Sequence, residues 1–404
     1  MIRIRGDVFK VEPRSPHTVL GLALAAVLVA AVAAACDGGG EEASPVSTAT
    51  QDASPVATAT QQASPSPISE IGKIAYIDVD GNLALINPDG SEATVLTEGG
   101  GVAAFRWSPD GSLIAVEGGE GAGAAVRVLG VEGDLAFELP GASDPVWSPN
   151  GDRLVVTEGS GLGVYDLGGA RVAEIADATG AAWSSDGATL AFMRPEGDAD
   201  KGVPMLLDLA AGQESPLSGD IQAADLTFPI AWRPGGEMVA WGNAVYDLAA
   251  GEKVELPGLA NSWSPDGRIL VVTLEFQPTS DSTPAHLLYA SEDFVPRIGL
   301  DVRVDPEGTP AWLYIKRWLA WSPDGRYLLY LDPRPSRTAA RVYDTAEIAQ
   351  DISFGVTGER PSVSSNGRHI VFMDGGNVWL GTLFDADQAP VLVQGSNPAW
   401  QPRG

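Results

Sequence analysis

The sequence predicts an all-β chain folded as a β-propeller of about eight four-stranded blades, with seven blades as the alternative count. The first observation is a phrase that reads "FRWSPDGSLIAV" at Phe105–Val116 and returns on average about every 42 residues, the length of a four-stranded blade. The second is composition, because 48 glycines and 30 prolines among 404 residues indicate many short elements joined by turns. No segment combines helical periodicity with helix caps, so long helices are not expected.

The repeated phrase marks each blade. Its central tryptophan, or the residue in that place, is found at Trp107, Trp147, Trp183, Trp232, Trp263, Trp321, Val363 and Trp400. Val363 belongs to a weaker copy, "VSSNGRHIVF", and the unit that begins at Trp232 is only 31 residues long. These two irregular units are the reason that seven blades remain the alternative.

The residues Trp-Ser-Pro-Asp-Gly within the phrase favour a tight turn between two antiparallel strands. Serine can accept a local backbone hydrogen bond, proline sets φ at the second turn position, and glycine takes the left-handed conformation. The β-branched and aliphatic run that follows is typical of a half-buried strand. The aspartates at this place, which could be mistaken for catalytic carboxylates, are therefore interpreted as turn residues: Asp110, Asp186, Asp266 and Asp324.

The two ends of the repeat region complement each other. The last phrase, "SNPAW", supplies one strand with none after it, and the segment from Lys73 to Gly99 supplies three strands with no tryptophan strand before them. Joining them makes one whole blade, so we expect the ring to close by pairing its N- and C-terminal strands. Closure removes the exposed sheet edge that invites aggregation.

The phrase "WSPDG-x-x-I-A" resembles the WD-like repeats of TolB-type propellers, which also occur in the propeller domain of dipeptidyl peptidases. The resemblance covers residues 71–404, and it departs from the family pattern at Gly235, Ser185 and Val363. It implies a propeller fold. The peptidase relatives carry their nucleophile in a separate α/β-hydrolase domain, but this sequence has no Gly-x-Ser-x-Gly motif, so peptidase activity is not expected.

The N-terminus is typical of an exported lipoprotein. Basic residues precede an apolar run from Val19 to Ala35 that ends at Cys36, the only cysteine in the chain. The Ala-Ala-Ala-Cys junction resembles a bacterial lipobox, although Ala33 stands where leucine is commonest. Residues 1–36 are therefore predicted to be a signal peptide ending at a lipidated Cys36, with an uncleaved transmembrane anchor as the alternative. Residues 37–70 are predicted to be a disordered Ser/Thr/Pro/Ala linker, and 71–404 the propeller, held at the membrane and facing the extracellular side or the periplasm.

Charge and residue counts exclude several function classes. A net charge of −28 argues against binding to nucleic acid, which needs Lys/Arg patches. One cysteine and three histidines leave little for a thiolate cluster, a zinc site or a histidine triad. "DVDGN" and "GDADKG" have the Asp-x-Asp spacing of calcium loops, but neither has the later glutamate, so both are interpreted as hairpin turns. No cofactor is predicted, and calcium stays open.

The longest unit, from Trp263 to Trp321, contains two insertions, and long loops in a repeat array are often functional. Their aromatic residues Phe276, Trp312 and Tyr314 are the candidate contacts for a ligand or partner, with local packing as the alternative. The expected function is a monomeric, non-enzymatic binding or scaffolding module for a protein or a cell-envelope glycan. A glycan hydrolase or lyase at the channel mouth and a sensor ectodomain are the alternatives.

Overall fold

The computed structural model describes residues 71–119, 123–197, 201–219, 221, 224–225, 230–273, 286–292, 294, 296–300, 319–331, 340–346, 351–354, 359–383 and 390–402. The chain divides into two compact units, residues 1–63 and 64–404, and every described residue belongs to the second. The predicted lipid attachment at Cys36 and the candidate contacts Phe276, Trp312 and Tyr314 lie outside the described residues. Among those that are described, none belongs to a helix long and apolar enough to span a bilayer.

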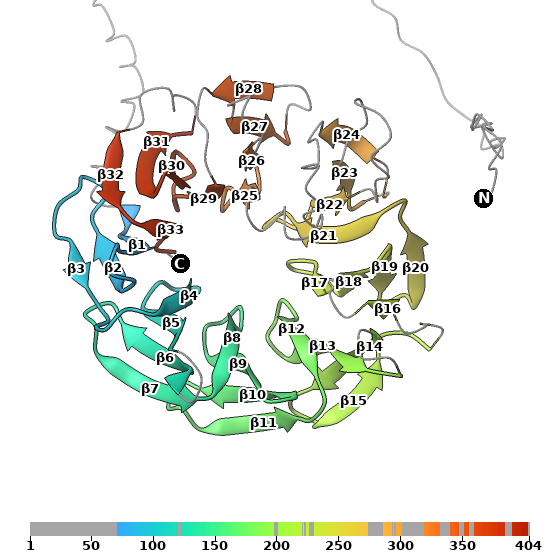
Figure 1. Ribbon diagram of the computed structural model, residues 1–404. Coiled ribbons are helices and arrows are strands. Elements are labelled where there is room, and N and C mark those ends of the chain that lie inside the picture. The colour runs from blue at the N-terminus through green and yellow to red at the C-terminus, as the bar shows by residue number, and fades with distance from the viewer. Residues whose placement is uncertain are drawn as a thin grey trace, which may run out of the picture. The chain divides into compact units, whose positions relative to one another are not determined.

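The described strands form eight antiparallel sheets around a central channel (Figure 1), so the fold is an eight-bladed β-propeller. The predicted all-β class and the count of eight blades are confirmed, and the alternative of seven is wrong. The weak copy at Val363 and the short unit at Trp232 each begin a complete four-stranded blade. A blade can therefore form without the repeat tryptophan, and from a unit that is shorter than the average.

From the channel to the rim, blades 1 to 4 consist of β33 (Ser396–Trp400), β1 (Ile74–Ile77), β2 (Leu83–Ile86) and β3 (Thr94–Val95); β4 (Val102–Trp107), β5 (Leu113–Gly118), β6 (Ala125–Gly130) and β7 (Leu135–Pro140); β8 (Ala142–Trp147), β9 (Arg153–Glu158), β10 (Gly161–Asp166) and β11 (Arg171–Ile175); and β12 (Thr179–Trp183), β13 (Thr189–Pro195), β14 (Lys201–Asp208) and β15 (Gln213–Pro216), with the short β16 (Ala224–Asp225) beside β14.

Blades 5 to 8 consist, in the same order, of β17 (Ile230–Trp232), β18 (Met238–Trp241), β19 (Ala244–Asp247) and β20 (Glu252–Glu255); β21 (Leu259–Trp263), β22 (Ile269–Thr273), β23 (His286–Ala290) and β24 (Pro296–Leu300); β25 (Leu319–Trp321), β26 (Tyr327–Leu331), β27 (Ala340–Asp344) and β28 (Asp351–Phe354); and β29 (Glu359–Val363), β30 (His369–Asp374), β31 (Asn377–Thr382) and β32 (Val391–Gln394).

Blade 1 closes the ring as the sequence predicts. Strand β33 from the C-terminal end pairs antiparallel with β1 from the start of the repeat region, placing Trp400 opposite Ile74 and Ala399 opposite Ala75. Two further hydrogen bonds extend the pairing, from Gln401 N to Lys73 O at 2.9 Å and from Lys73 N to Gln401 Oε1 at 3.0 Å. Neither chain segment could form this four-stranded sheet without the other.

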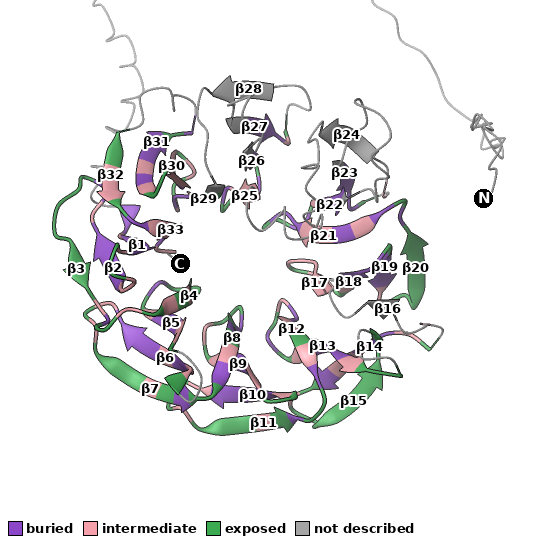
Figure 2. Ribbon diagram, viewed as in Figure 1, coloured by how far each residue is buried: buried purple, intermediate pink, exposed green. Residues whose placement is uncertain are grey.

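The hydrophobic core lies in the seams between blades. One cluster joins Ala115 and Val126 of blade 2 to Leu154 and Trp147 of blade 3, and similar clusters occupy the other seams. Second and third strands such as β1 and β2 are consequently buried along their whole length, whereas rim strands such as β15 and β20 are exposed (Figure 2). Each blade therefore depends on its neighbours for burial, as in other repeat architectures.

The phrase turns fold as predicted. In blade 2, Ser108 is 1% exposed; its hydroxyl donates to Asp110 Oδ1 at 2.6 Å and accepts from Leu113 N at 2.9 Å. Gly111 has φ of 70°, in the left-handed region that glycine tolerates. The serine bonds to the acidic or amide side chain two residues on at Ser108–Asp110, Ser184–Asp186, Ser264–Asp266, Ser322–Asp324 and Ser364–Asn366. The motif aspartates are thus turn residues, and the prediction is confirmed.

Two blades carry a long side chain where the others have this serine. In blade 5, Arg233 donates from Nε to Gly267 O at 2.9 Å and from Nη2 to Ser291 Oγ at 3.2 Å, both in blade 6. In blade 1, Gln401 Nε2 donates to Gly111 O of blade 2 at 2.8 Å. Turns that lack the internal serine bond are therefore held by the next blade, which explains why the "WRPGG" and "WQPRG" phrases still fold.

The repeated tryptophans fasten one blade to the next. In five of the seven repeat tryptophans, the indole N–H donates to the carbonyl of the residue before the tryptophan of the preceding blade. The bonds are Trp107 to Ala399, Trp147 to Arg106, Trp183 to Val146, Trp232 to Ala182 and Trp263 to Ala231. These five bonds cover five consecutive seams. Within the described part of the chain, Nε1 of Trp321 and of Trp400 is buried without a hydrogen-bond partner, and Val363 has no indole. Three consecutive seams therefore lack this bond.

The phrase aspartates predict an acid sensitivity. Hydrogen bonds from the Ser108 and Ser184 hydroxyls lower the pKa of Asp110 and Asp186 below the ordinary value of 3.8. As the pH falls, the unfolded chain therefore takes up protons before the folded one does. The stability that these two carboxylates contribute is fully present above pH 3.8 and is lost as the pH falls through their pKa values in the folded protein. We expect the urea midpoint to fall between about pH 5 and about pH 3.

The control for this experiment exists in the chain itself. Asn366 holds the same turn in blade 8, accepting from Ser364 Oγ at 2.7 Å and from Arg368 N at 3.0 Å. The double variant Asp110→Asn, Asp186→Asn should keep the turn but lose the titration, so its midpoint should fall less on acidification. An equal fall in both proteins would contradict the assignment.

Candidate binding site at the channel mouth

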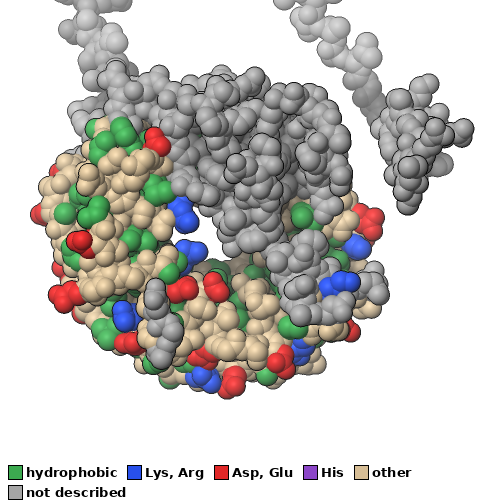
Figure 3. Space-filling view, viewed as in Figure 1, with side chains coloured by type: hydrophobic (Ala, Val, Ile, Leu, Met, Phe, Trp, Pro, Cys, Tyr) green, Lys and Arg blue, Asp and Glu red, His purple; other side chains and the backbone are tan. Residues whose placement is uncertain are grey.

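The inner strands of the eight blades border a central hollow, visible in the space-filling view (Figure 3). All inner strands run in the same direction, so the channel has two different mouths. We call the end at which the inner strands begin the bulge mouth, and the end that carries the Ser-Pro-Asp-Gly turns the turn mouth.

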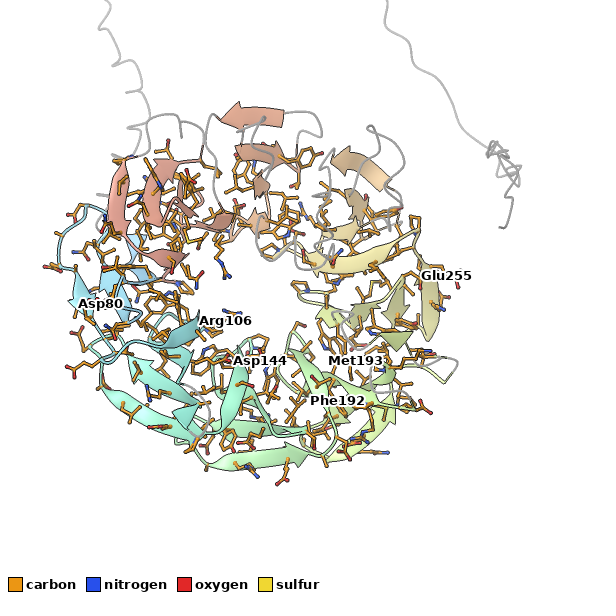
Figure 4. The ribbon with its side chains drawn as sticks, in the orientation of Figure 1. Asp80, Arg106, Asp144, Phe192, Met193 and Glu255 are labelled. Carbon is orange, nitrogen blue, oxygen red and sulfur yellow. The ribbon has the colours of Figure 1, made fainter. Side chains whose placement is uncertain are left out.

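The residue just before the repeat-tryptophan position is uncharged in every blade but one. Its occupants in the other seven blades are small or medium-sized and uncharged: Ala399, Val146, Ala182, Ala231, Ser262, Ala320 and Ser362. In blade 2 the residue is Arg106, which is exposed, and Figure 4 places it on the inner side of its blade, next to the hollow. Since alanine serves at four equivalent positions, packing of the ring does not need an arginine here.

The inner strands of four blades contain a β-bulge three residues before the tryptophan position. The residues there have positive φ: 49° at Asp144, 67° at Gly180, 55° at Arg360 and 52° at Asn397. The strand register shifts at each of these places. A bulge leaves a residue unpaired and turns its side chain away from the regular pleat.

Three of these bulge residues are not glycine, and each stands directly before a proline. The pairs are Asp144-Pro145, Arg360-Pro361 and Asn397-Pro398. A left-handed conformation costs a non-glycine residue roughly 1–3 kcal/mol, and the α regions are further disfavoured before proline. Strained residues of this kind concentrate at functional sites, where the surrounding structure holds them in place. Their recurrence at one position of the blade points to the bulge mouth.

Together these residues form a polar arc over four adjacent blades. We define the arc as Arg360 of blade 8, Asn397 of blade 1, Arg106 of blade 2 and Asp144 of blade 3. Three of these are the bulge residues, whereas Arg106 is the fifth of the six residues of β4 and stands two positions farther into the channel, toward the turn mouth. Figure 4 shows Arg106 and Asp144 on neighbouring inner strands beside the hollow. The next blades present Gly180, Ala182 and Ala231 at the corresponding places, so the arc occupies one side of the channel.

Two charged residues of the arc, Arg106 and Asp144, make few side-chain contacts with the described part of the chain. Within the described part of the chain, the Arg106 side chain donates one hydrogen bond, from Nη1 to the neighbouring Phe105 O at 2.8 Å, and it makes no ion pair. Five other described arginines do have a carboxylate partner: Arg127, Arg171, Arg194, Arg268 and Arg326. The Asp144 backbone N–H donates to Glu117 Oε2 at 3.1 Å, and its own carboxylate accepts no hydrogen bond from a described residue.

The possible calcium loop "DVDGN" is the hairpin turn between β1 and β2, as predicted. Asp78 Oδ1 accepts from Asp80 N at 2.9 Å and from Asn82 N at 2.8 Å, so this carboxylate serves the turn itself. Asp198 and Asp200 of "GDADKG" lie outside the described residues, although β13 and β14 on either side pair as a hairpin. Among the residues that the structure describes, no group of His, Cys, Asp and Glu could hold a metal ion.

His369 occupies a half-buried strand position, as expected. Its ring lies 6.4 Å from the Trp400 ring at the seam between blades 8 and 1, and burial lowers its pKa. The insertion residues Phe276, Trp312 and Tyr314 remain candidates outside the described residues. The strand ends that flank them, at Thr273, His286, Leu300 and Leu319, lie at the bulge mouth according to the strand directions.

The polar arc was not predicted from the sequence, although a signal for it is present there. Aligning the phrases shows three copies of the pattern X-Pro-x-(Trp/Val), namely "DPVW", "RPSV" and "NPAW". The same alignment shows Arg106 as the single charged residue before a repeat tryptophan. What the alignment lacked was the direction of each side chain, which depends on the bulge.

The sequence matches no protein-family model and no curated protein. Solved structures share the fold at low identity. Dihydro-heme d1 dehydrogenase NirN in complex with DHE matches with a TM-score of 0.53 and 14% identity, covering 82% of this chain and 75% of that one. Oligogalacturonate lyase in complex with manganese matches with a TM-score of 0.50 and 15% identity, covering 77% and 98%.

TolB from Acinetobacter baumannii, the namesake of the resembling family, matches with a TM-score of 0.37 and 14% identity, covering 82% of this chain and 66% of TolB. The chain described by Figure 1 is a β-propeller on the evidence of its own eight sheets. These likenesses concern the fold alone, and the proteins named are as different as a dehydrogenase and a lyase. Function must therefore be argued from the channel residues of this chain.

Proposed function

We propose that this protein is a membrane-anchored, extracytoplasmic binding module that takes a cell-envelope glycan at the bulge mouth of its channel. The observation that carries the proposal is the polar arc, in which three non-glycine residues hold a strained conformation at one position of adjacent or nearby blades. Guanidinium, amide and carboxylate groups supply both donors and acceptors, as recognition of sugar hydroxyls requires. Closed propellers present such groups on a rigid frame, which lowers the entropy lost on binding.

The binding test uses the full chain and an array of neutral and acidic oligosaccharides. We expect binding of at least one class, and at least a roughly 10-fold loss in the double variant Asp144→Ala, Asn397→Ala, because each group would lose one or more hydrogen bonds to the ligand. The matched control is Asn150→Ala, which changes an exposed polar residue at the turn mouth. Equal loss in both variants, or no binding to any oligosaccharide, would overturn the proposal.

Attachment through Cys36 is the second part of the proposal. It is supported by the apolar run before this single cysteine and by the Ser/Thr/Pro/Ala segment after it. Two acyl chains on the cysteine suffice for stable anchoring. We expect mass spectrometry of the membrane-extracted protein to show a mature chain beginning at a diacylated Cys36, and Cys36→Ser to release the chain from membranes. An unmodified Cys36 in the mature protein would refute this part.

A glycan hydrolase or lyase is the rival function, and one contact favours it. The hydrogen bond from Asp144 N to Glu117 Oε2 brings two carboxyl-bearing residues to the same mouth, and such pairs can perform acid–base chemistry on glycosidic bonds. The array ligands decide between the two functions. New reducing ends or unsaturated products that disappear in Glu117→Gln would establish the enzyme, whereas binding without products favours the module.

A further inference from the structure

We infer that the ligand that enters at the bulge mouth is an acidic oligosaccharide, and that Arg106, two positions deeper in the channel than the bulge residues, binds the carboxylate of one of its uronic acid residues. This inference rests on the proposed function and specifies its ligand class. The observation behind it is that Arg106 is charged although the residues at the equivalent position of the other blades are not. The ring therefore packs without a charge at this position. Ala399, Ala231 and Ala182 stand in the same place in other blades.

The geometry of Arg106 suits a carboxylate. The bond from Nη1 to Phe105 O, at 2.8 Å, uses one of the five N–H donors of the guanidinium and holds the group close to its own strand. The remaining donors can form the two parallel hydrogen bonds that arginine makes with a carboxylate. No carboxylate of a described residue ion-pairs with Arg106, so a ligand would not have to displace one.

The overall charge of −28 does not prevent such binding. At physiological ionic strength, charges more than about 8 Å apart in solvent are largely screened. An anion in the channel therefore responds chiefly to the groups around it, and Figure 3 shows both basic and acidic side chains at the edge of the hollow. Among these groups, Arg106 carries a positive charge that no carboxylate of a described residue neutralises.

Asp144 and Asn397 favour a sugar acid over an acidic peptide. An ionised carboxylate only accepts hydrogen bonds, so Asp144 suits a ligand that offers hydroxyl donors, which the ionised side chains of an Asp/Glu peptide lack. The Asn397 amide can both donate and accept, as a ring hydroxyl does. A uronic acid combines both requirements in one unit, with a carboxylate for Arg106 and hydroxyls for Asp144 and Asn397.

The test compares three probes on the full chain: a polygalacturonate oligomer, the same oligomer as its methyl ester, and polyglutamate. We expect the acid oligomer to bind, the ester to bind at least roughly 10-fold more weakly, and Arg106→Ala to lower affinity for the acid form by a similar factor while leaving that for the ester unchanged. Arg106→Ala should fold, since alanine occupies this place elsewhere. Arg268→Ala is the control: it removes the same charge from the turn mouth, where the side chain is 82% exposed.

The outcomes separate this inference from the proposed function. Equal binding of acid and ester, or full affinity in Arg106→Ala, overturns the role of Arg106. Binding of neutral oligosaccharides that Asp144→Ala abolishes would keep the proposed function and overturn the acidic ligand. Tighter binding of polyglutamate than of either oligomer would overturn both, in favour of a protein partner.

Discussion

Removal of the last nine residues, from Ser396 to Gly404, is expected to abolish cooperative folding of the ring. The deletion takes away β33, the inner strand of blade 1, and with it the buried Trp400, which is 4% exposed. Loss of a buried tryptophan side chain alone costs roughly 3–5 kcal/mol, and each lost backbone hydrogen bond adds about 1 kcal/mol. Their sum approaches the roughly 5–15 kcal/mol that stabilises a whole domain.

Circular dichroism and urea unfolding of the full and shortened chains measure this effect. The shortened chain should lack a cooperative transition and should aggregate, because deletion uncovers the edge of β1, whose four residues are all buried in the closed ring. A chain that ends at Pro402 keeps β33 and is the control. If the chain without β33 unfolds at the same urea concentration as the control, closure does not stabilise the ring as argued.

The sequence was sufficient to predict the blades because the residues that form each turn are close together in the chain. Ser108, Asp110 and Gly111 act within one five-residue turn, and each makes the contact that its residue type suggests. Closure was also predictable, since counting strands at the two chain ends needs no knowledge of side-chain direction. Even the irregular "WRPGG" turn forms, although the bond that supports it runs from its own Arg233 to Gly267 O in the next blade.

The candidate site was harder to predict because it depends on contacts between distant residues. The equivalence of Asp144, Arg360 and Asn397 can be read from the aligned phrases, but the bulge that redirects their side chains depends on the register with the neighbouring strand. Likewise, the spacing of Trp147 and Arg106 does not show that the indole binds the arginine carbonyl. Phe276, Trp312 and Tyr314 lie outside the described residues and stay predictions.

The indole bonds predict that two similar tryptophan substitutions will differ in cost. Trp147 and Trp400 are both buried, at 8% and 4% exposure, but only Trp147 has a partner for its N–H, Arg106 O at 3.1 Å. Trp147→Ala should destabilise the ring by about 3–5 kcal/mol through lost packing and the cavity left behind. Trp147→Phe restores part of the packing and isolates the loss of the hydrogen bond.

Trp147→Phe should therefore cost about 1–2 kcal/mol more than Trp400→Phe, measured as the difference in free energy of unfolding in urea. In Trp147→Phe the carbonyl of Arg106 loses a buried donor, whereas Trp400→Phe removes an N–H that has no partner among the described residues. Hydrogen exchange gives a second measurement. The three seams without an indole bond, from blade 6 to blade 1, should open more readily than the five that have one, and Trp147→Phe should speed exchange at the seam between blades 2 and 3. Equal costs for the two phenylalanine variants would mean that packing alone joins the blades.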